Sequence, residues 1–340
     1  MPQVPVNPKI SIVTPSFNQG QFLEQTIVSV LEQQYPHLEY IIIDGGSTDN
    51  SVDIIKKYEK HLHYWVSEPD GGQSEAINKG LLHCTGEIFN WLCSDDYYEP
   101  SALKTVAGAF TTSGARVVSG KFKILDSPLH PPESVLAGMI ADSSLPKTIA
   151  RIKMTQPATF FRLSDIRLLG GISQELDYFM DLELMIRYLI YFGQADIEQI
   201  DETLVNYRVH ADSKTFRELD PSGIREDSAF TIEKNCIFQA LARAVGHKKH
   251  ATLLAALTKP FRKTYIPALE IKDASLVESS IEYYLYDFMK NCFYAGEYRK
   301  AALIAHGIDP GLLEPEEQKG LKYLERELIL KKIKKYFLRK

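Results

Sequence analysis

Two adjacent acids, Asp95 and Asp96, offer the clearest chemistry in this 340-residue sequence. They lie near the end of the run EIFNWLCSDDYY, whose apolar residues predict a buried strand that ends in two carboxylates. Carboxylate oxygens are the ligands that Mg²⁺ and Mn²⁺ prefer, and such ions keep coordination positions open for phosphate oxygens. We therefore expect a divalent metal at Asp96 and Asp95. An acid pair before Pro100 also fits a solvated turn or a helix cap, so the pair alone does not decide between them.

Other polar segments follow predicted strands and could share a cleft with the acids. Residues 15–18 follow the apolar run ISIVT, and residues 44–49 follow YIII. Ligands of α/β sheets bind beyond the carboxyl ends of the strands, which is where these segments lie. Asp44 fits an N-cap equally well, because GGSTDNS leads into a predicted helix. Residues 70–73 precede a helix whose free N–H groups suit phosphate or sugar hydroxyls, although a plain turn is also compatible.

An alternation of strands and helices positions these segments. Residues 21–34 carry apolar side chains at helical spacing between two strand-like runs, and the alternation continues to about residue 100. The pattern predicts an α/β fold with a mostly parallel sheet flanked by helices. Residues 176–192 predict a later helix with acids near its start, and YRVHADSKT predicts a strand followed by a loop. Beyond about residue 232 the pattern is helical, so we expect an α/β domain at 1–230 and a helical C-terminal extension at 231–340.

Composition restricts the class of protein. The formal net charge of -5 argues against a domain that coats nucleic acid, so no nucleic-acid partner is expected. Four cysteines without a CxxC pair suit neither a zinc site nor a disulfide framework, which favours a reducing compartment. The N-terminal residues lack the apolar segment of a signal peptide, and no apolar run is long enough to cross a bilayer. We expect a cytoplasmic chain.

Residues 321–340 predict an amphipathic helix with a basic end. Its apolar stripe consists of Leu321, Leu324, Leu328, Ile329, Ile333 and Tyr336, and its basic residues are Lys331, Lys332, Lys334, Lys335, Arg339 and Lys340. Such a helix can make peripheral contact with an anionic bilayer, here the inner face of the plasma membrane. It can equally pack on its own domain, with its cations complementing the helix dipole. Both interpretations remain open.

The order of the polar segments resembles a known family. The segments TPSFN, IIIDGGSTD, EPDGGQSEAINKG and LCSDDYY resemble, in this order, the nucleotide-binding half of family 2 glycosyltransferases of the GT-A fold. TQPATFFR, GGISQELDYFMDLELMIR and YRVHADSKT resemble the acceptor-side segments of that family, so the resemblance covers about residues 9–215. It implies an inverting transfer of a sugar from a nucleotide-sugar, with a UDP-sugar favoured, to a glycan or lipid-linked glycan in bacterial surface polysaccharide assembly.

The resemblance also implies roles for individual residues. Pro15 and Asn18 would shape the nucleoside pocket, Asp44 would bind the base, and Ser47 and Asp49 would hold the loop in shape. The donor-binding set is Thr14, Pro15, Ser16, Asn18, Asp44, Ser47, Asp70, Gly72, Gln73, Asn78, Asp95, Arg208 and Ser213. His210 would lie near the metal or the diphosphate, which makes Asp96, Asp95 and His210 the expected metal ligands.

The resemblance assigns the catalytic base to Asp181 in YFMDLELMIR, with Asp177 and Glu183 as the other candidates. A surface acid that stabilises a helix N-terminus is the alternative for Asp181. Many relatives carry an acid at the position of Cys93, so metal binding here depends on Asp95 and Asp96. A nucleotide-sugar-binding or scaffold subunit without catalysis is therefore the second hypothesis. Nucleotidyl transfer is disfavoured because TPSFNQGQF has no basic residue.

Overall fold

The computed structural model describes residues 7–126, 131, 133–214, 216 and 228–337. The chain divides into two compact units. Unit 1 takes Met1–Ile140, Lys153–Tyr188 and Phe192–Ile224, and unit 2 takes Ala141–Ile152, Leu189–Tyr191 and Arg225–Lys340. Unit 2 thus includes two short segments from far upstream of the predicted boundary at 230/231.

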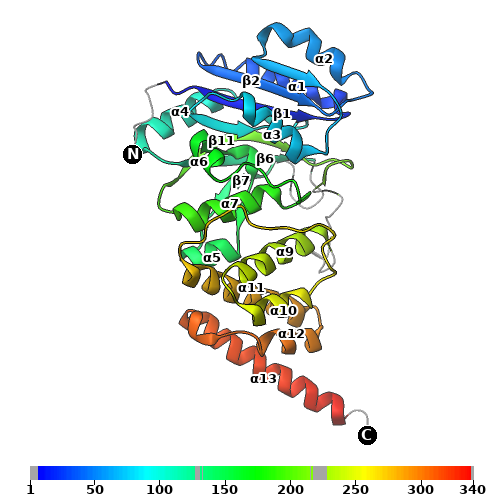
Figure 1. The fold of residues 1–340 in the computed structure, drawn as a ribbon, viewed down its shortest axis with the longest axis vertical. Coiled ribbons are helices and arrows are strands. Elements are labelled where there is room, and N and C mark those ends of the chain that lie inside the picture. Colours follow the sequence, from blue (N-terminus) through cyan, green and yellow to red (C-terminus); the bar gives the residue numbers. More distant parts are fainter. Residues whose placement is uncertain (1–6, 127–130, 132, 215, 217–227, 338–340) are drawn as a thin grey trace. The chain divides into compact units, whose positions relative to one another are not determined.

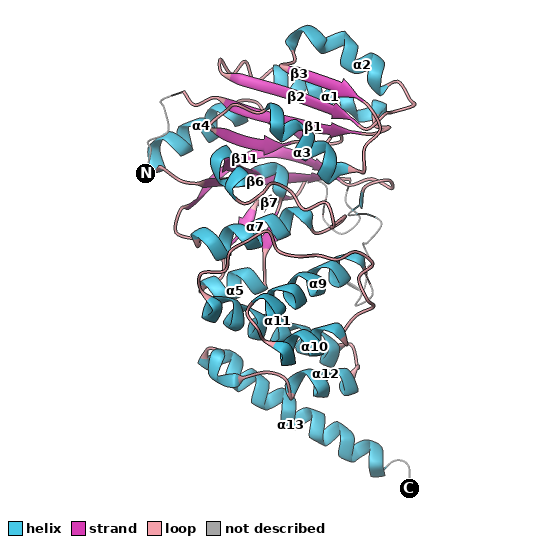
Figure 2. Ribbon diagram, in the orientation of Figure 1, coloured by secondary structure: helices cyan, strands magenta, loops and turns pink. Residues whose placement is uncertain are grey.

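Unit 1 is built on one large sheet (Figure 2). Its strand order is β3 (Tyr64–Ser67), β2 (Leu38–Asp44), β1 (Ile10–Ser16), β4 (Ile88–Trp91), β10 (Thr159–Arg162), β6 (Val117–Leu125), β11 (Ile197–Arg208) and β5 (Tyr97–Tyr98), with β7 (Val135–Ala137) paired to β6. The first four strands are parallel, as is the β6–β11 pair, whereas β10, β5 and β7 pair antiparallel. A separate ladder joins β8 (Met139–Ile140) to β9 (Lys153–Met154). The predicted α/β sheet is confirmed, with its parallel part at the N-terminal end.

Helices cover both faces of this sheet (Figure 1). They are α1 (Gly20–Leu31), α2 (Ser51–Tyr58), α3 (Gln73–His83), α4 (Ala102–Ser113), α6 (Leu163–Leu168) and α7 (Met180–Phe192), with 3-10 turns η1 (Glu59–His61) and η2 (Gln156–Ala158). β1 is buried on both faces because its apolar run is continuous. Ile12 packs in the core that includes Ile27 of α1, while Val13 lies against Gly80 of α3.

Two predicted element boundaries are wrong. The strand expected to continue through the two acids ends at Trp91, and a turn follows it. The helix expected from residue 176 begins at Met180, which leaves Asp177 outside it. In both places the apolar residues continue the predicted pattern beyond the observed element. The element ends earlier because the polar groups of that segment bond to other parts of unit 1.

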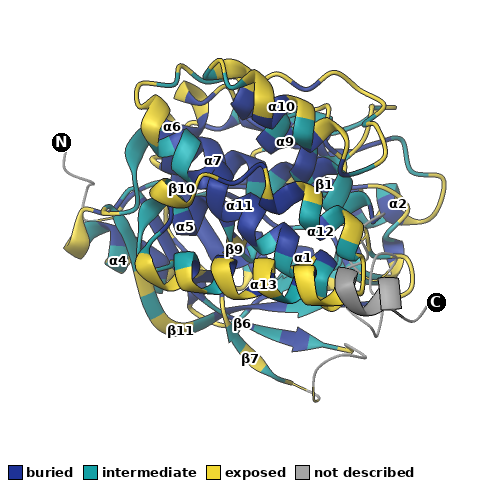
Figure 3. Ribbon diagram, turned by 90° about the horizontal axis from the view of Figure 1, so that it is seen from below, coloured by how far each residue is buried: buried dark blue, intermediate teal, exposed yellow. Residues whose placement is uncertain are grey.

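Unit 2 is helical. It contains α5 (Leu145–Ala150), α9 (Ala229–Ala244), α10 (Lys248–Ala255), α11 (Ala274–Tyr294), α12 (Tyr298–Ala305), η3 (Pro310–Leu312) and α13 (Pro315–Phe337). The helix α11 is buried along most of its length, whereas α13 has an exposed side (Figure 3). No helix among the described residues is both long and apolar enough to cross a bilayer.

The predicted C-terminal stripe is divided by the structure. Leu321, Leu324 and Leu328 are buried, so the first half of α13 packs within unit 2, whereas Ile329 is exposed. The side chains of Ile333, Tyr336, Lys332, Lys334 and Lys335 lie outside the described residues, as do Arg339 and Lys340. Membrane contact by the basic end therefore stays a prediction.

A buried carboxylate, Glu39 of β2, ties three segments together. Its Oε2 accepts hydrogen bonds from Ser11 Oγ at 2.5 Å and from the Thr85 N–H at 2.6 Å, and Lys9 Nζ lies 2.7 Å from Oε1. Burial by itself would raise the pKa of Glu39, but the hydrogen bonds from Lys9, Ser11 and Thr85 outweigh it and lower the pKa to about 2. The charged form of Glu39 therefore stabilises the folded state.

We predict that Glu39→Gln lowers the free energy of unfolding of unit 1 by about 2 kcal/mol at pH 7, because hydrogen bonds to a charged group are lost. The folded-state pKa lies below the ordinary value of 4.5, so this contribution is present above pH 4.5 and is lost as pH falls toward about 2. The difference between wild type and variant should therefore shrink across that window. Both tryptophans, Trp65 and Trp91, lie in unit 1, so denaturant unfolding followed by tryptophan fluorescence reports this unit alone.

Glu68→Gln is the matched control. Glu68 pairs with Lys79 at 3.0 Å on the surface, and its side chain is 53% exposed. We expect a change within about 0.5 kcal/mol at pH 7, since exposed ion pairs contribute little. Equal effects of the two substitutions would show that Glu39 has no special contribution.

Candidate active site

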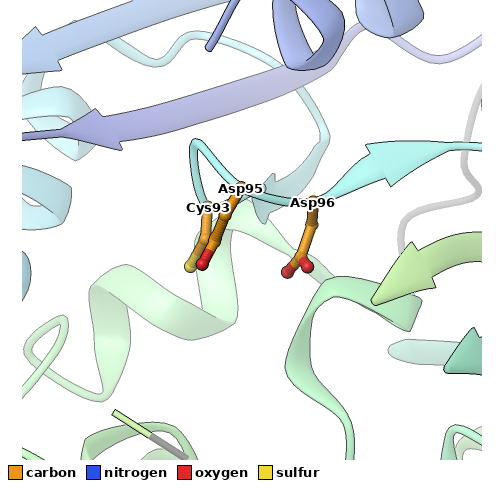
Figure 4. A group of neighbouring side chains, drawn as sticks. All are labelled: Cys93, Asp95 and Asp96. Carbon is orange, nitrogen blue, oxygen red and sulfur yellow. The ribbon is translucent and has the colours of Figure 1, made fainter. Parts of the chain in front are cut away.

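Asp95 and Asp96 lie in a turn that follows β4, and their side chains project to the same side of this turn. The Asp96 N–H donates to the Cys93 carbonyl at 3.1 Å and closes this turn. Successive side chains of a strand point to opposite faces, so two adjacent acids can point the same way only after the strand has ended. Cys93, Asp95 and Asp96 project to the same side of the turn (Figure 4), and their ligand atoms all lie within 4.8 Å of one another. We call residues 93–96 the acid turn.

The electrostatics of the acid turn favour a bound cation. Asp96 is 2% exposed. Burial and the neighbouring charge of Asp95 raise the pKa of Asp96 well above its ordinary value, although the Arg208 N–H at 2.9 Å from Oδ1 opposes the shift. Burial, followed by the charges of Asp95 and Asp96, also raises the pKa of the Cys93 thiol. A divalent cation between the carboxylates would relieve their repulsion, so this donor set fits such an ion.

Two residues from the end of β11 contact the acid turn. His210 Nε2 lies 3.0 Å from Asp95 Oδ2, and its ring packs on Phe22 with the centroids 4.8 Å apart. The Arg208 guanidinium donates to the Asp95 carbonyl and, at 2.8 Å, to Gln25 Oε1. The structure thus brings His210 to the predicted metal ligands, and it engages Arg208 with the backbone of the acid turn.

The loop after β2 is held by its own acid. Asp44 is fully buried and accepts hydrogen bonds from Ser47 N–H at 2.9 Å, Ser47 Oγ at 2.5 Å and Ser67 Oγ at 2.7 Å. Asn18 has the left-handed φ of 52°, and its Oδ1 accepts from the Thr48 N–H at 2.8 Å. The loops after β1 and β2 are therefore joined side by side, as expected for parallel neighbours. Asp44 shapes this loop through all of these contacts.

The turn before α3 lies against the loop after β2. A Cβ on Gly45 would come within 3.1 Å of both Asp70 carboxylate oxygens, so the lack of a side chain at Gly45 favours this close approach. Asp70 Oδ1 accepts from the Gly72 N–H at 2.8 Å, where Gly72 has a φ of 116°. Gln73 connects this turn to the acid turn, because its Nε2 donates to Cys93 Sγ at 3.1 Å. The predicted polar segments do meet at one edge of the sheet.

Several predicted donor residues are engaged elsewhere. Asn78 clasps the backbone of Ile172, with bonds of 2.7 Å to its carbonyl and 2.9 Å from its N–H. Ser213 Oγ donates to the His210 carbonyl at 2.8 Å. Thr14 Oγ1 lies 3.1 Å from Tyr40 OH in the core, and Pro15 and Ser16 are buried at the end of β1. Their roles in donor binding stay predictions.

One exposed aromatic is absent from the predicted donor set. Phe17 is 59% exposed and lies between Ser16 and Asn18, at the carboxyl end of β1. The sequence signal that could have identified Phe17 is an apolar ring within a polar loop, because a ring in such a loop is not expected to be buried in the core.

The three candidate bases differ in their surroundings, and Asp177 is an exposed residue outside α7. Glu183 is 1% exposed and forms a two-bond ion pair with Arg187, at 2.5 and 2.8 Å. Arg187 also donates to the carbonyls of Leu169 and Gly171, which makes this pair a structural bond. Asp181 is partly exposed in the first turn of α7, and its charge is among those that raise the pKa of Cys93. Of the two helical acids, Asp181 is therefore the one near the acid turn and open to solvent.

Comparisons with known proteins agree with this geometry. The model of the family described as Glycosyl transferase family 2 matches residues 11–167. The putative teichuronic acid biosynthesis glycosyltransferase TuaG of Bacillus subtilis is 34% identical over 42% of this chain and 59% of that protein. An uncharacterized glycosyltransferase of Mycobacterium tuberculosis is 38% identical over 32% of this chain and 42% of that protein. The chain thus spans about half the length of these relatives.

Solved structures extend the likeness in fold. S. aureus TarS superimposes with a TM-score of 0.59 at 17% identity, covering 95% of this chain and 53% of that chain. TarS 1-349 in complex with UDP gives a TM-score of 0.58 at 16% identity, covering 94% of this chain and 88% of that chain. The chain therefore carries a glycosyl transferase family 2 domain over residues 11–167, built on the GT-A fold.

Proposed function

We propose that this chain is an inverting glycosyltransferase. It moves a sugar from a nucleotide-diphosphate sugar to a hydroxyl of a glycan or lipid-linked glycan. The observation that carries the proposal is the meeting of the acid turn with the loops after β1 and β2 and the turn before α3, in a chain with a family 2 domain. TuaG, named for teichuronic acid biosynthesis, supports a substrate in bacterial surface polysaccharide assembly.

Asp181 acts as the base in the proposed reaction. It accepts the proton of the acceptor hydroxyl as that oxygen attacks the anomeric carbon from the face opposite the diphosphate. The bond from the anomeric carbon to the diphosphate oxygen breaks, and the nucleoside diphosphate leaves with the bonding electrons. One displacement inverts the configuration, so no covalent sugar intermediate is needed. Glu183 is unsuited to this role because Arg187 holds both of its oxygens.

Asp95 and Asp96, with His210 beside them, would hold the divalent cation, Mn²⁺ or Mg²⁺. Such an ion supplies positive charge to the diphosphate oxygens of the leaving group. Cys93 places a thiol beside the two carboxylates, and burial, followed by the charges of Asp95 and Asp96, raises the pKa of that thiol.

The donor site lies along the loops after β1 and β2. The exposed ring of Phe17 offers a surface on which a base can stack, next to the loop that Asp44 shapes. TarS 1-349 was solved in complex with UDP and with UDP-GlcNAc, which supports a UDP-sugar as the donor here. A binding subunit without turnover would keep this donor site, and the presence of Cys93 in place of an acid is the observation that favours it. The solvent-open Asp181 favours the enzyme.

A thermal-shift screen of nucleoside diphosphates and nucleotide-sugars with Mn²⁺ tests the donor class. We expect UDP and UDP-sugars to stabilise the protein, since a ligand at about 100 times its Kd adds about 2.7 kcal/mol. Adenosine diphosphate is the control for unspecific diphosphate binding. A screen in which no nucleotide raises the melting temperature would contradict the proposed function.

Replacement of Asp96 by Asn should weaken Mn²⁺ binding at least about tenfold, because a charged ligand is lost. Isothermal titration of the full chain with MnCl₂ measures the Kd directly, and turnover of the donor should fall in parallel. Asp201→Asn is the control. Asp201 lies on β11, its side chain is 94% exposed, and it pairs with Lys121 of β6. An Asp96→Asn variant with wild-type Mn²⁺ affinity, and with full turnover after EDTA treatment, would exclude this metal site.

Asp181→Asn should lower kcat at least about 100-fold while the Kd for UDP stays within about threefold, because only the base is lost. Glu183→Gln should instead lower the free energy of unfolding by about 3 kcal/mol, since it leaves Arg187 buried without its charge partner. Single-turnover kinetics, UDP titration and denaturant unfolding of both variants separate the two roles. Our assignment is wrong if Asp181→Asn keeps near wild-type turnover and a folded Glu183→Gln abolishes it.

A further inference from the structure

The helix α1 carries polar side chains on the face that meets the acid turn and β5. Thr26 is fully buried there, Ser29 follows it three residues later, and Gln33 lies in the turn just past the end of α1 at Leu31. Residues three apart lie along one side of a helix. The apolar side of α1, which includes Leu23 and Ile27, packs on the sheet. The polar side is available for a separate task.

These side chains bind the backbone that carries the two acids. Thr26 Oγ1 lies 2.9 Å from the Ser94 carbonyl and 2.7 Å from the Asp96 carbonyl. Ser29 Oγ accepts from the Tyr98 N–H at 3.1 Å. Gln33 Nε2 donates to the Glu99 carbonyl at 2.9 Å, and its Oε1 accepts from the Leu103 N–H at 3.2 Å. Side chains of α1 and of the turn after it thus contact peptide groups of Ser94, Asp96, Tyr98, Glu99 and Leu103.

The Thr26 hydroxyl offers a hydrogen bond to carbonyls of the acid turn that have no strand partner. Residues 94–96 have left β4, so no neighbouring strand pairs with their carbonyls. Buried carbonyls without a hydrogen bond are costly, and a buried unsatisfied group destabilises by about 1–3 kcal/mol. Because the direction of a side chain follows its backbone, a shift of the Asp96 peptide would separate the two carboxylates. Thr26 therefore acts on the acids through their main chain.

The N-terminus of α1 is held by hydrogen bonds to the loop after β2 and to the first residue of α2. The Gly20 N–H donates to Asp49 Oδ2 at 2.9 Å, and the Gln19 N–H donates to Ser51 Oγ at 3.2 Å. A Cβ on Gly20 would lie 2.0 Å from Asn50 Oδ1, so the loop after β2 closes tightly on this end. The helix α1 therefore sets the spacing between the loop after β2 and the acid turn.

We propose that Thr26 is a positioning residue for the cation site, with Ser29 and Gln33 extending its hold on the acid turn. The inference rests on the proposed function, because it assumes that Asp95 and Asp96 bind a divalent cation. It goes further by assigning a role to a buried hydroxyl that is not itself a ligand. Groups that orient metal ligands change metal affinity by about 10- to 100-fold when they are removed.

Titration of the full chain with MnCl₂ tests the proposal. Thr26→Val keeps the shape of the side chain but removes the hydroxyl, and it should raise the Mn²⁺ Kd at least about tenfold. Thr26→Ser restores the hydroxyl and should stay within about threefold of wild type. Loss of fold alone cannot produce this rescue, and the fluorescence of Trp91 at the end of β4 checks that each variant is folded.

Ser119→Ala is the matched control. Ser119 is a buried hydroxyl of unit 1 that pairs with Thr159 Oγ1 at 3.0 Å, and it makes no hydrogen bond to the acid turn among the described residues. It should cost comparable stability but leave the Mn²⁺ Kd within about threefold. Ser29→Ala provides a milder variant if Thr26→Val does not fold, and its Kd should rise at least about threefold.

The outcomes separate this inference from the function on which it rests. If Asp96→Asn loses Mn²⁺ while folded Thr26→Val and Ser29→Ala both bind it as wild type does, the positioning role is overturned and the metal site stands. If the wild-type chain binds no Mn²⁺, the metal site and the positioning role both fail. A weakened Thr26→Val that Thr26→Ser restores supports the proposal.

Discussion

The candidate site depends on two neighbouring carboxylates, Asp95 and Asp96, which lie on one side of a turn where Asp96 is buried (Figure 4). Their mutual repulsion, together with burial, raises the pKa of Asp96, so this arrangement must be maintained by other contacts. The main chain of the acid turn supplies them, because it is bonded to Thr26 of α1 on one side and to Arg208 of β11 on the other. The site is therefore organised through its peptide groups before any ligand arrives.

The acids of unit 1 differ in how far they are buried and in which donors they contact. Glu39, Asp44 and Glu183 have their oxygens occupied by donors of the protein itself, and they join segments that are distant in sequence. Asp95 is partly exposed and contacts His210, and Asp181 is partly exposed at the start of α7. A carboxylate whose oxygens are held by donors from distant segments thus stabilises the fold, and a partly exposed carboxylate can also meet a substrate or an ion.

The candidate site extends beyond the region that the family model matches. That region ends at residue 167, whereas Asp181, Arg208 and His210 come from later segments. Arg208 and His210 reach the acid turn because β11 pairs with both β6 and β5, and β5 directly follows the acids. This pairing explains how a loop near residue 210 contacts residue 95. Within the matched region, Gln73 donates to the Cys93 thiol and so attaches the turn before α3 to the acid turn.

The sequence by itself determined the alternation of strands and helices, the four polar segments and the two acids, because hydrophobic periodicity and turn residues are local properties. It could not determine where β4 ends or that α7 starts at Met180, since both boundaries are set by hydrogen bonds to distant residues. It left Asp181 and Glu183 as alternatives, and only the buried partner Arg187 separates them. The positioning contacts of Thr26 were equally invisible, because a threonine in an amphipathic helix has no local signature. Tertiary structure decided these points, since each depends on which polar groups are brought together once the apolar faces have packed.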